Sequence, residues 1–378
     1  IKKLRAAGFS TYLVGGSVRD LLAKQTPKDF DISTSARPEQ IKQIFQKNCL
    51  LIGRRFRLAH IRFGHKILEV ATFRAGENDS DLIVQDNIWG SEEEDVRRRD
   101  FTINGLLYDP ESHTVIDYVG GWEDIHKGIL RVIGDPATRF KQDPVRMLRL
   151  LKFRARFKFN IDPEARSALI NCREEIIKSS PARLLEELLR MLESGASAPF
   201  FSLMNEAGLL ELLMPPLAEF LRKEEGKQIY MLLASADKIN LKNLKNPLDR
   251  SVLTACLLYP LLVNELTSQY LDKGETPHLG EITILSASVV KAIVTSSFTH
   301  FPRRISAISS FILATQYRLN PISGKRNLRP RMLHHKEFDL ALSFLRVRAN
   351  IDPSLREAYN AWQGVFKHRD RHSDHKGH

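Results

Sequence analysis

The sequence has few cysteines and no long apolar run, and both absences exclude classes of protein. Its three cysteines, Cys49, Cys172 and Cys256, lie far apart in the 378 residues and fit neither a zinc motif nor a disulfide framework. We therefore expect a reducing, cytoplasmic environment. No apolar run approaches the roughly 20 residues of a membrane helix, and the opening segment is not built like a signal peptide. Because the chain begins with Ile, we expect a native N-terminal segment to precede it.

Acidic residues are in the minority, which indicates the kind of partner. Lys and Arg number 57 against 45 Asp and Glu, a formal net charge of +12. A protein this basic is expected to bind a polyanion. Nucleic acid fits better than a membrane surface because no basic amphipathic anchor with a clean apolar face stands out. The length allows two or three domains with cores of their own.

The segment 13–32, LVGGSVRDLLAKQTPKDFDI, begins with a glycine turn between two predicted elements. Its first residues are typical of the end of a buried strand. Gly15 and Gly16 form a turn at which backbone N–H groups can approach a phosphate, and the residues after them, including Arg19, favour a helix. A Gly-Gly pair alone is usually only a turn, so its interpretation depends on the residues that end the segment.

Two carboxylates separated by one residue end the same segment. Asp29 and Asp31 on a second strand would point to one face, with Phe30 on the opposite, buried face. Side-by-side carboxylates repel each other unless a divalent cation lies between them. A D-x-D pair is often only a solvated strand edge, but after a phosphate-binding turn it predicts an active site. Glu69, an acidic residue in an apolar strand, is either half-exposed or a third acid beside this pair.

Two later segments place polar residues at helical spacing. Asn104 lies four residues after Asp100 and is expected on the same helix face, and Asp143 and Arg146, three apart, are expected to share another. An Arg donor beside an Asp acceptor matches the ring-nitrogen acceptor and amino donor of adenine and cytosine, and rejects guanine and uracil. In an arbitrary protein the same pair would be a surface ion pair. Arg149, Lys152 and Arg156 continue this helix as a basic stripe that suits a phosphate backbone.

These motifs resemble the tRNA nucleotidyltransferase and bacterial poly(A) polymerase branch of the nucleotidyltransferase superfamily. The resemblance rests on GGSVRDLL, on KDFDIST, on RRDFTIN from Arg98 to Asn104, and on the segment from Asp143 to Arg146. The last is similar to the family's EDxxR motif, but Gln142 stands where Glu is common, which puts any role of that first acid in doubt. The resemblance implies an α+β protein, with an N-terminal nucleotidyltransferase α/β head containing a small mixed sheet and an all-α body.

The resemblance also implies roles for individual residues. Asp29 and Asp31 would hold two Mg²⁺ ions, with Mn²⁺ as an alternative, and Asp100 and Glu69 complete the set of catalytic carboxylates. The residues expected to bind the nucleotide are Gly15, Gly16, Arg19, Arg99, Asn104, Asp143, Arg146 and Arg149. Arg183 and Glu187 are expected to support the helix that reads the base. The weaker candidates for RNA binding are Arg54, Arg55, Lys152, Arg156, Lys325 and Arg326.

Two activities of this branch compete, polyadenylation and CCA addition to tRNA. Asp143 and Arg146 suit both, whereas the segment 51–61, LIGRRFRLAHI, resembles one peculiar to bacterial poly(A) polymerases. We therefore expect a polynucleotide adenylyltransferase that uses ATP and RNA 3′ ends and no membrane. A catalytically inactive RNA-binding protein is a third alternative, but it should have lost the metal carboxylates, which are present. The sequence identifies no protein partner such as an RNA chaperone or the degradation machinery.

The order of these motifs predicts four segments. Residues 1–135 are expected to form the catalytic head, 136–230 a helical domain that reads the nucleotide and binds RNA, and 231–362 a helical RNA-binding body. Residues 363–378, which end in KHRDRHSDHKGH, are expected to form a basic, His-rich and disordered tail.

Overall fold

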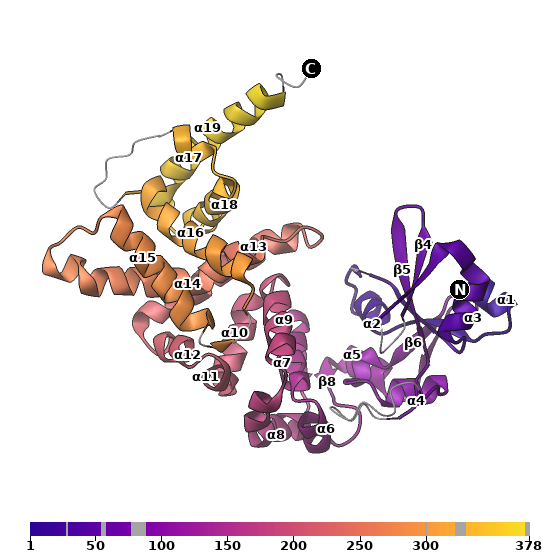
Figure 1. Cartoon of the computed structure of the whole chain (residues 1–378). Coiled ribbons are helices and arrows are strands. Elements are labelled where there is room, and N and C mark those ends of the chain that lie inside the picture. Colours follow the sequence, from indigo (N-terminus) through magenta and orange to yellow (C-terminus); the bar gives the residue numbers. More distant parts are fainter. Residues whose placement is uncertain are drawn as a thin grey trace. The chain divides into compact units, whose positions relative to one another are not determined.

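The computed structural model describes residues 1–27, 29–53, 58–76, 88–295, 297–298, 301–321 and 330–374. The chain divides into two compact units, Ile1–Glu175 and Ile176–His378, whose elements are labelled in Figure 1. The first unit takes in residues 136–175, which the sequence analysis grouped with 176–230. The division into four functional segments stays a prediction.

A mixed sheet organises the first unit. Within the described residues it has seven strands in the order β3-β4-β5-β2-β1-β6-β7. The neighbours β2 and β5 run parallel, and the other neighbouring strands run antiparallel. The strands are β1 Thr11–Val14, β2 Asp31–Thr34, β3 Cys49–Ile52, β4 Leu58–Phe63, β5 Lys66–Thr72, β6 Leu106–Asp109 and β7 Thr114–Asp117. The small mixed sheet expected of the head is therefore confirmed.

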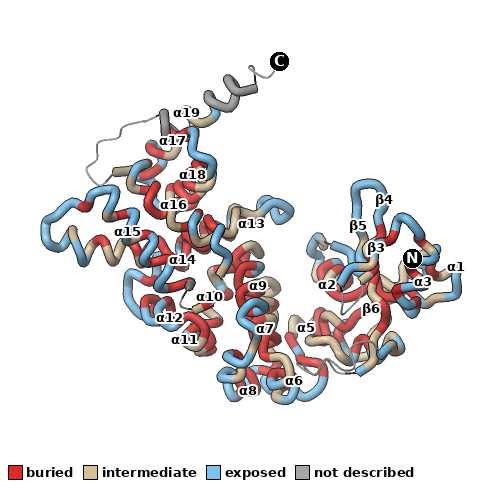
Figure 2. The backbone as a smooth tube through the Cα atoms, viewed as in Figure 1, coloured by how far each residue is buried: buried red, intermediate tan, exposed pale blue. Residues whose placement is uncertain are grey.

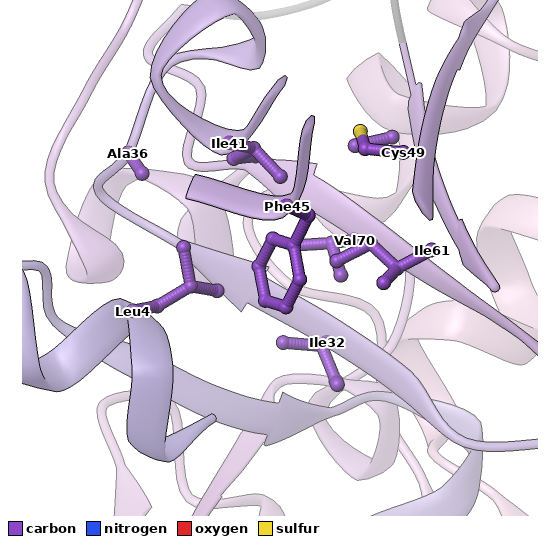
Figure 3. Packing of buried hydrophobic residues seen from close by; sticks show 9 residues of the cluster. Leu4, Ile32, Ala36, Ile41, Phe45, Cys49, Ile61 and Val70 are labelled. Carbon is purple, nitrogen blue, oxygen red and sulfur yellow. The ribbon is translucent and has the colours of Figure 1, made fainter. Parts of the chain in front are cut away.

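The strands alternate between a buried and an open face, and this alternation positions the site. Ile32, Ile61 and Val70 pack under the helices α1 Lys2–Ala6 and α3 Pro38–Phe45. Their neighbours along the strands must point to the other face. Each apolar side chain buried here contributes about 1.5–3 kcal/mol to stability. Figure 3 shows the labelled members of this cluster: Leu4, Ile32, Ala36, Ile41, Phe45, Cys49, Ile61 and Val70.

Helices and short turns complete the first unit. The pair of short strands β8 Ile129–Leu130 and β9 Asn160–Ile161 runs parallel. The remaining helices of this unit are α2 Gly16–Leu22, α4 Glu92–Arg97, α5 Gly121–Lys127, α6 Pro136–Gln142, α7 Val145–Phe157 and α8 Pro163–Cys172, with a 3₁₀ turn, η2, over Thr102–Asn104. The strand expected over Asp29–Asp31 begins only at Asp31, and Phe30 is 43% exposed rather than buried.

The second unit is helical throughout its described residues, which confirms the all-α body. Its helices are α9 Pro181–Leu192, α10 Ser197–Glu206, α11 Leu209–Leu213, α12 Pro215–Leu221, α13 Lys227–Lys242, α14 Arg250–Gln269, α15 Leu279–Val290, α16 Arg303–Leu319, α17 Pro330–Leu333, α18 Phe338–Ala349 and α19 Arg356–Asp374. We expected no apolar run of the length of a membrane helix, but the stretch Arg250–Lys273 is long and apolar enough to cross a membrane by length and composition. Of its apolar window, 72% is buried inside the protein. It is the central helix of this unit (Figure 2).

The expected disordered tail is wrong for residues 363–374, because α19 continues to Asp374. The helix is anchored just before this segment. Trp362 is 1% exposed, its indole N–H donates to the Leu319 carbonyl at 3.0 Å, and its ring packs against Phe338. A helix held this firmly at one point can extend further, since propagation needs only one new hydrogen bond per added residue.

Candidate active site

The glycine turn lies between β1 and α2 and brings an arginine close to its backbone. Gly15 is the residue before the first turn of α2 and has φ +64°, a conformation that favours glycine. A Cβ atom at Gly15 would lie 3.0 Å from Nη1 of Arg99. Arg99 also donates from Nη1 to the Asn104 carbonyl at 3.2 Å. The structure thus brings together the turn and the arginine that were both expected to contact phosphates.

A row of polar side chains crosses the open face of the sheet at the start of β2. The parallel pairing of β2 with β5 places Asp31 opposite Glu69. The pairing of β5 with β4 places Glu69 opposite His60, with 3.3 Å between His60 Nε2 and Glu69 Oε1. Asp29 comes just before the strand. The third acid that the sequence analysis considered therefore lies beside Asp31, on the same face.

The electrostatics of this row suit a bound cation. Asp31 is open to solvent on one side, but the protein packed around its other side raises its pKa. The negative charges of Glu69 and Asp29 raise the pKa further, and Arg99 opposes them. A divalent ion would remove this repulsion. Within the described residues, no three His, Cys, Asp or Glu side chains converge to hold a metal.

Asp100 and Asn104 are in contact but do not share a helix. Helix α4 ends at Arg97, and η2 begins at Thr102, so the expected common helix face is wrong. The contact is nevertheless made, because Asn104 Nδ2 donates to Asp100 Oδ1 at 2.8 Å. The backbone N–H of Phe101 donates to the same oxygen at 2.9 Å. These two donors fix the orientation of the Asp100 carboxylate.

Asp95, which was not among the residues expected from the sequence, holds Arg98 and Arg99 in place. Asp95 is 2% exposed and accepts hydrogen bonds from Arg98 Nε and Arg99 Nη2, both at 2.9 Å. Burial alone would raise its pKa, but the two arginines outweigh burial, and the pKa lies below its usual value. The spacing of an acid four residues before a base was the signal that could have identified it.

Replacing Asp95 with Asn should destabilise the protein by about 1.5–3 kcal/mol at neutral pH, since hydrogen bonds to a charged partner are lost. A carboxylate with a lowered folded-state pKa stabilises the fold above its unfolded pKa, and that stabilisation is lost as the pH falls through the folded value. The difference in unfolding temperature between wild type and Asp95→Asn should therefore shrink on acidification. Asp272→Asn, at an exposed position, is the control. A difference independent of pH would contradict the assignment.

Asp143 and Arg146 lie at a break between helices rather than on one helix face. Asp143 follows α6 with φ −141°, and α7 begins at Val145. Arg146 is buried, and its Nη1 donates to the Arg139 carbonyl at 3.0 Å. Burial and the charge of Arg139 lower the pKa of Arg146, whereas Asp143 and Asp100 oppose this. The pair is thus close in space, although the expected helix face is wrong.

The basic stripe of α7 faces carboxylates of its own unit. Arg149 Nη1 lies 3.8 Å from Asp100 Oδ2, and Arg156 Nη2 lies 3.8 Å from Asp20 Oδ2. Lys152 lies over the ring of the adjacent phenylalanine of α7, 5.9 Å from its centroid. RNA binding by this stripe stays a prediction.

The other expected site residues lie in the second unit or outside the described residues. Arg183 is exposed and Glu187 is buried, both on α9 of the second unit, and their expected support of the base-reading helix stays a prediction. The candidates outside the described residues are Arg54, Arg55, Lys325 and Arg326.

Three models of protein families match parts of the chain. The model of the "Poly A polymerase head domain" matches residues 11–131. That of the "Probable RNA and SrmB- binding site of polymerase A" matches 158–221, and that of the "Polymerase A arginine-rich C-terminus" matches 286–377. Together they span both units of the chain.

Relatives and a solved structure refine the comparison. Poly(A) polymerase I of Salmonella typhimurium is 34% identical over 365 residues, covering 93% of this chain and 77% of the relative. The CCA-adding enzyme of Lactobacillus helveticus is 35% identical over 232 residues, 61% of this chain and 57% of the relative. The structure of the Bacillus stearothermophilus CCA-adding enzyme in complex with CTP superimposes with a TM-score of 0.67 at 26% identity, covering 96% of this chain and 80% of that one. The chain belongs to the bacterial poly(A) polymerase family.

Proposed function

We propose that the chain is a template-independent polynucleotide adenylyltransferase that transfers AMP from ATP to RNA 3′ ends. The observation that carries this proposal is the extent of the match. Similarity to poly(A) polymerase I spans 93% of the chain, whereas similarity to the CCA-adding enzyme of Lactobacillus helveticus spans 61%. The sequence beyond the shared part therefore agrees with polyadenylation.

Asp29 and Asp31 are the residues that would hold two divalent ions, Mg²⁺ with Mn²⁺ as an alternative. When bound, such ions increase the acidity of the RNA 3′ hydroxyl and stabilise the pyrophosphate leaving group. Residues of the chain itself would bind and orient the nucleotide. The backbone at Gly15 and Gly16, together with Arg99, would position the triphosphate, and Asp100, one of the expected catalytic carboxylates, would contact the ribose. No side-chain general base is required when the hydroxyl is activated in this way.

Asp143 and Arg146 would select the base without a template. Arg146 uses one of its five N–H donors for the Arg139 carbonyl, which leaves others for a ring-nitrogen acceptor. The carboxylate of Asp143 would accept from an exocyclic amino group. This arrangement admits ATP and excludes GTP and UTP by donor and acceptor order. It supports adenylation but does not distinguish it from CCA addition.

Replacing Gly15 with Ala should reduce the rate of AMP incorporation about tenfold and raise KM for ATP, since the new methyl group would displace Arg99 by a fraction of an ångström. Steady-state kinetics with an RNA oligomer measure both parameters. Gly64→Ala is a matched control, because Gly64 has φ +59° but a Cβ atom there would have no heavy atom within 4 Å. It shares a positive φ without the contact. Equal losses in both variants would contradict a role for the Gly15–Arg99 approach.

The activity itself is tested by extension of two labelled RNAs, an unstructured oligomer and a tRNA lacking its CCA end. Each of the four nucleotides is supplied separately, and ATP is also supplied with CTP. We expect long, ATP-dependent tails on the oligomer. Addition confined to the truncated tRNA and stopping after CCA would replace polyadenylation by the alternative that the CTP-bound structural relative favours. Extension of neither RNA would favour an inactive RNA-binding protein.

The proposed location of the enzyme is the cytoplasm. Its three cysteines are free and buried, and burial raises the pKa of the Cys256 thiol beyond its usual range. Free thiols persist in a reducing compartment. RNA 3′ ends and ATP are its substrates.

A further inference from the structure

We infer that Arg19 is a positioning residue that locks the Asp100 carboxylate and helix α7 together, and that it does not contact the triphosphate. This inference rests on the proposed function. It replaces the expectation that Arg19 cradles phosphates.

The guanidinium of Arg19 is enclosed by other groups of the first unit. Arg19 is 5% exposed. Its Nε and Nη2 donate to Asp20 Oδ1 at 2.8 and 2.6 Å, and its carbon Cζ lies 4.8 and 5.0 Å from the ring centroids of Phe153 and Phe157 of α7. A cation held between a carboxylate and two aromatic rings is already stabilised. Little of the Arg19 guanidinium is therefore accessible to a phosphate.

The third nitrogen of Arg19 determines which way the Asn104 amide points. Nη1 donates to Asn104 Oδ1 at 2.5 Å. Arginine can only donate, so the amide oxygen must face Arg19 and the amide nitrogen must face away. That nitrogen donates to Asp100 Oδ1 at 2.8 Å. Without Arg19 the amide could rotate and place its oxygen against a carboxylate, which only accepts hydrogen bonds.

The same network reaches α7 by two further contacts. Asp100 Oδ2 faces Arg149 at 3.8 Å, and Asp20 Oδ2 faces Arg156 at 3.8 Å. Arg149 and Arg156 belong to the helix that carries Arg146. The geometry therefore connects the carboxylate expected at the ribose with the helix expected to read the base, and Arg19 lies at the centre of the connection.

The test compares Arg19→Lys, Asn104→Ala and the double variant by kcat and KM for ATP. Lysine keeps the charge, which would suffice for a phosphate ligand, but loses the fork that bonds Asp20 and Asn104 together. We expect kcat to fall about 10–100-fold in each single variant, as for other residues that orient a catalytic group, with KM for ATP within about twofold. Because Arg19 and Asn104 both act through Asp100, the kcat of the double variant should be no more than about threefold below that of the less active single variant.

Controls separate positioning from folding and from the proposed function. Arg97→Lys makes the same change at an exposed arginine paired with Glu93 and should leave both parameters unchanged. If Arg19→Lys does not fold, the test rests on Asn104→Ala. We expect this variant to have a lower kcat but the same unfolding temperature as wild type. A raised KM with kcat preserved, or losses that multiply in the double variant, would overturn the inference. Wild type is assayed first on both RNAs: extension of the tRNA alone overturns only polyadenylation, and extension of neither overturns both proposals.

Discussion

Asp31→Asn should lower AMP incorporation at least about a thousandfold, because a divalent ion supplies several kcal/mol of transition-state stabilisation and each 1.36 kcal/mol changes the rate about tenfold. Asparagine has the same shape as aspartate but no charge to attract the ion. Asp31 lies beside Glu69 and Asp29, whose negative charges raise its pKa, so removal of its own charge is expected to weaken binding of the ion. Single-turnover extension of an RNA oligomer with ATP and Mg²⁺ measures it.

The stability of Asp31→Asn, unlike its activity, should not fall. A carboxylate whose folded-state pKa is raised destabilises the fold above that pKa, and the destabilisation disappears as the pH falls toward the unfolded value. In metal-free buffer at neutral pH, Asp31→Asn should therefore unfold at the wild-type temperature or above it. Added Mg²⁺ should stabilise wild type and not the variant. With Asp272→Asn as the control, wild-type activity in Asp31→Asn, or an equal response to Mg²⁺, would refute the metal assignment.

Arg146→Ala should lose selection of the base as well as activity. A well-formed two-donor contact to a base contributes about 1–3 kcal/mol of discrimination. We expect the preference for ATP over GTP, as a ratio of kcat/KM values, to fall about 10–100-fold. The burial of Arg146 makes this an effect of the site and not of a mobile surface side chain. Competitive incorporation from mixed nucleotides provides the ratio.

A matched change on the same helix shows whether the loss is local. Arg154 lies on α7 and donates to the carbonyls of Lys158 and Phe159 at 2.7 Å, away from Asp143. Arg154→Ala should keep the nucleotide preference of wild type. If Arg146→Ala lowered the rates with ATP and GTP equally, Arg146 would support the fold of the site without reading the base.

The residues that sequence reasoning placed correctly are those whose partners are set by local rules. Glycines followed by a helix predicted the turn at Gly15, and an acidic residue in an apolar strand led to Glu69. Strand pairing then placed Glu69 beside Asp31. The single-residue spacing of Asp29 and Asp31 was sufficient to predict repulsion between them, even though the strand begins only at Asp31.

The errors arose where spacing was converted into helix faces. Asp100 and Asn104 are four apart, and Asp143 and Arg146 three apart, yet neither pair shares a helix. Both pairs are nevertheless close in space, because chain turns also bring residues three or four apart together. The proline after Asp143 disfavours a helical conformation for that residue and explains why the helix breaks there.

The sequence by itself determined the glycine turn, the acidic pair, the helical body and the family. The turn and the acidic pair follow from motifs a few residues long, and the helical body and the family follow from the resemblance that these motifs carry. Only the tertiary structure decided the partners of Arg19, which are Asp20 and Asn104. It also decided the row from Asp31 to Glu69 and His60. The physical reason is that hydrogen bonds and ion pairs act over about 3–4 Å, and residues as far apart as Arg19 and Asn104 come within that distance only when the strands and helices between them have packed.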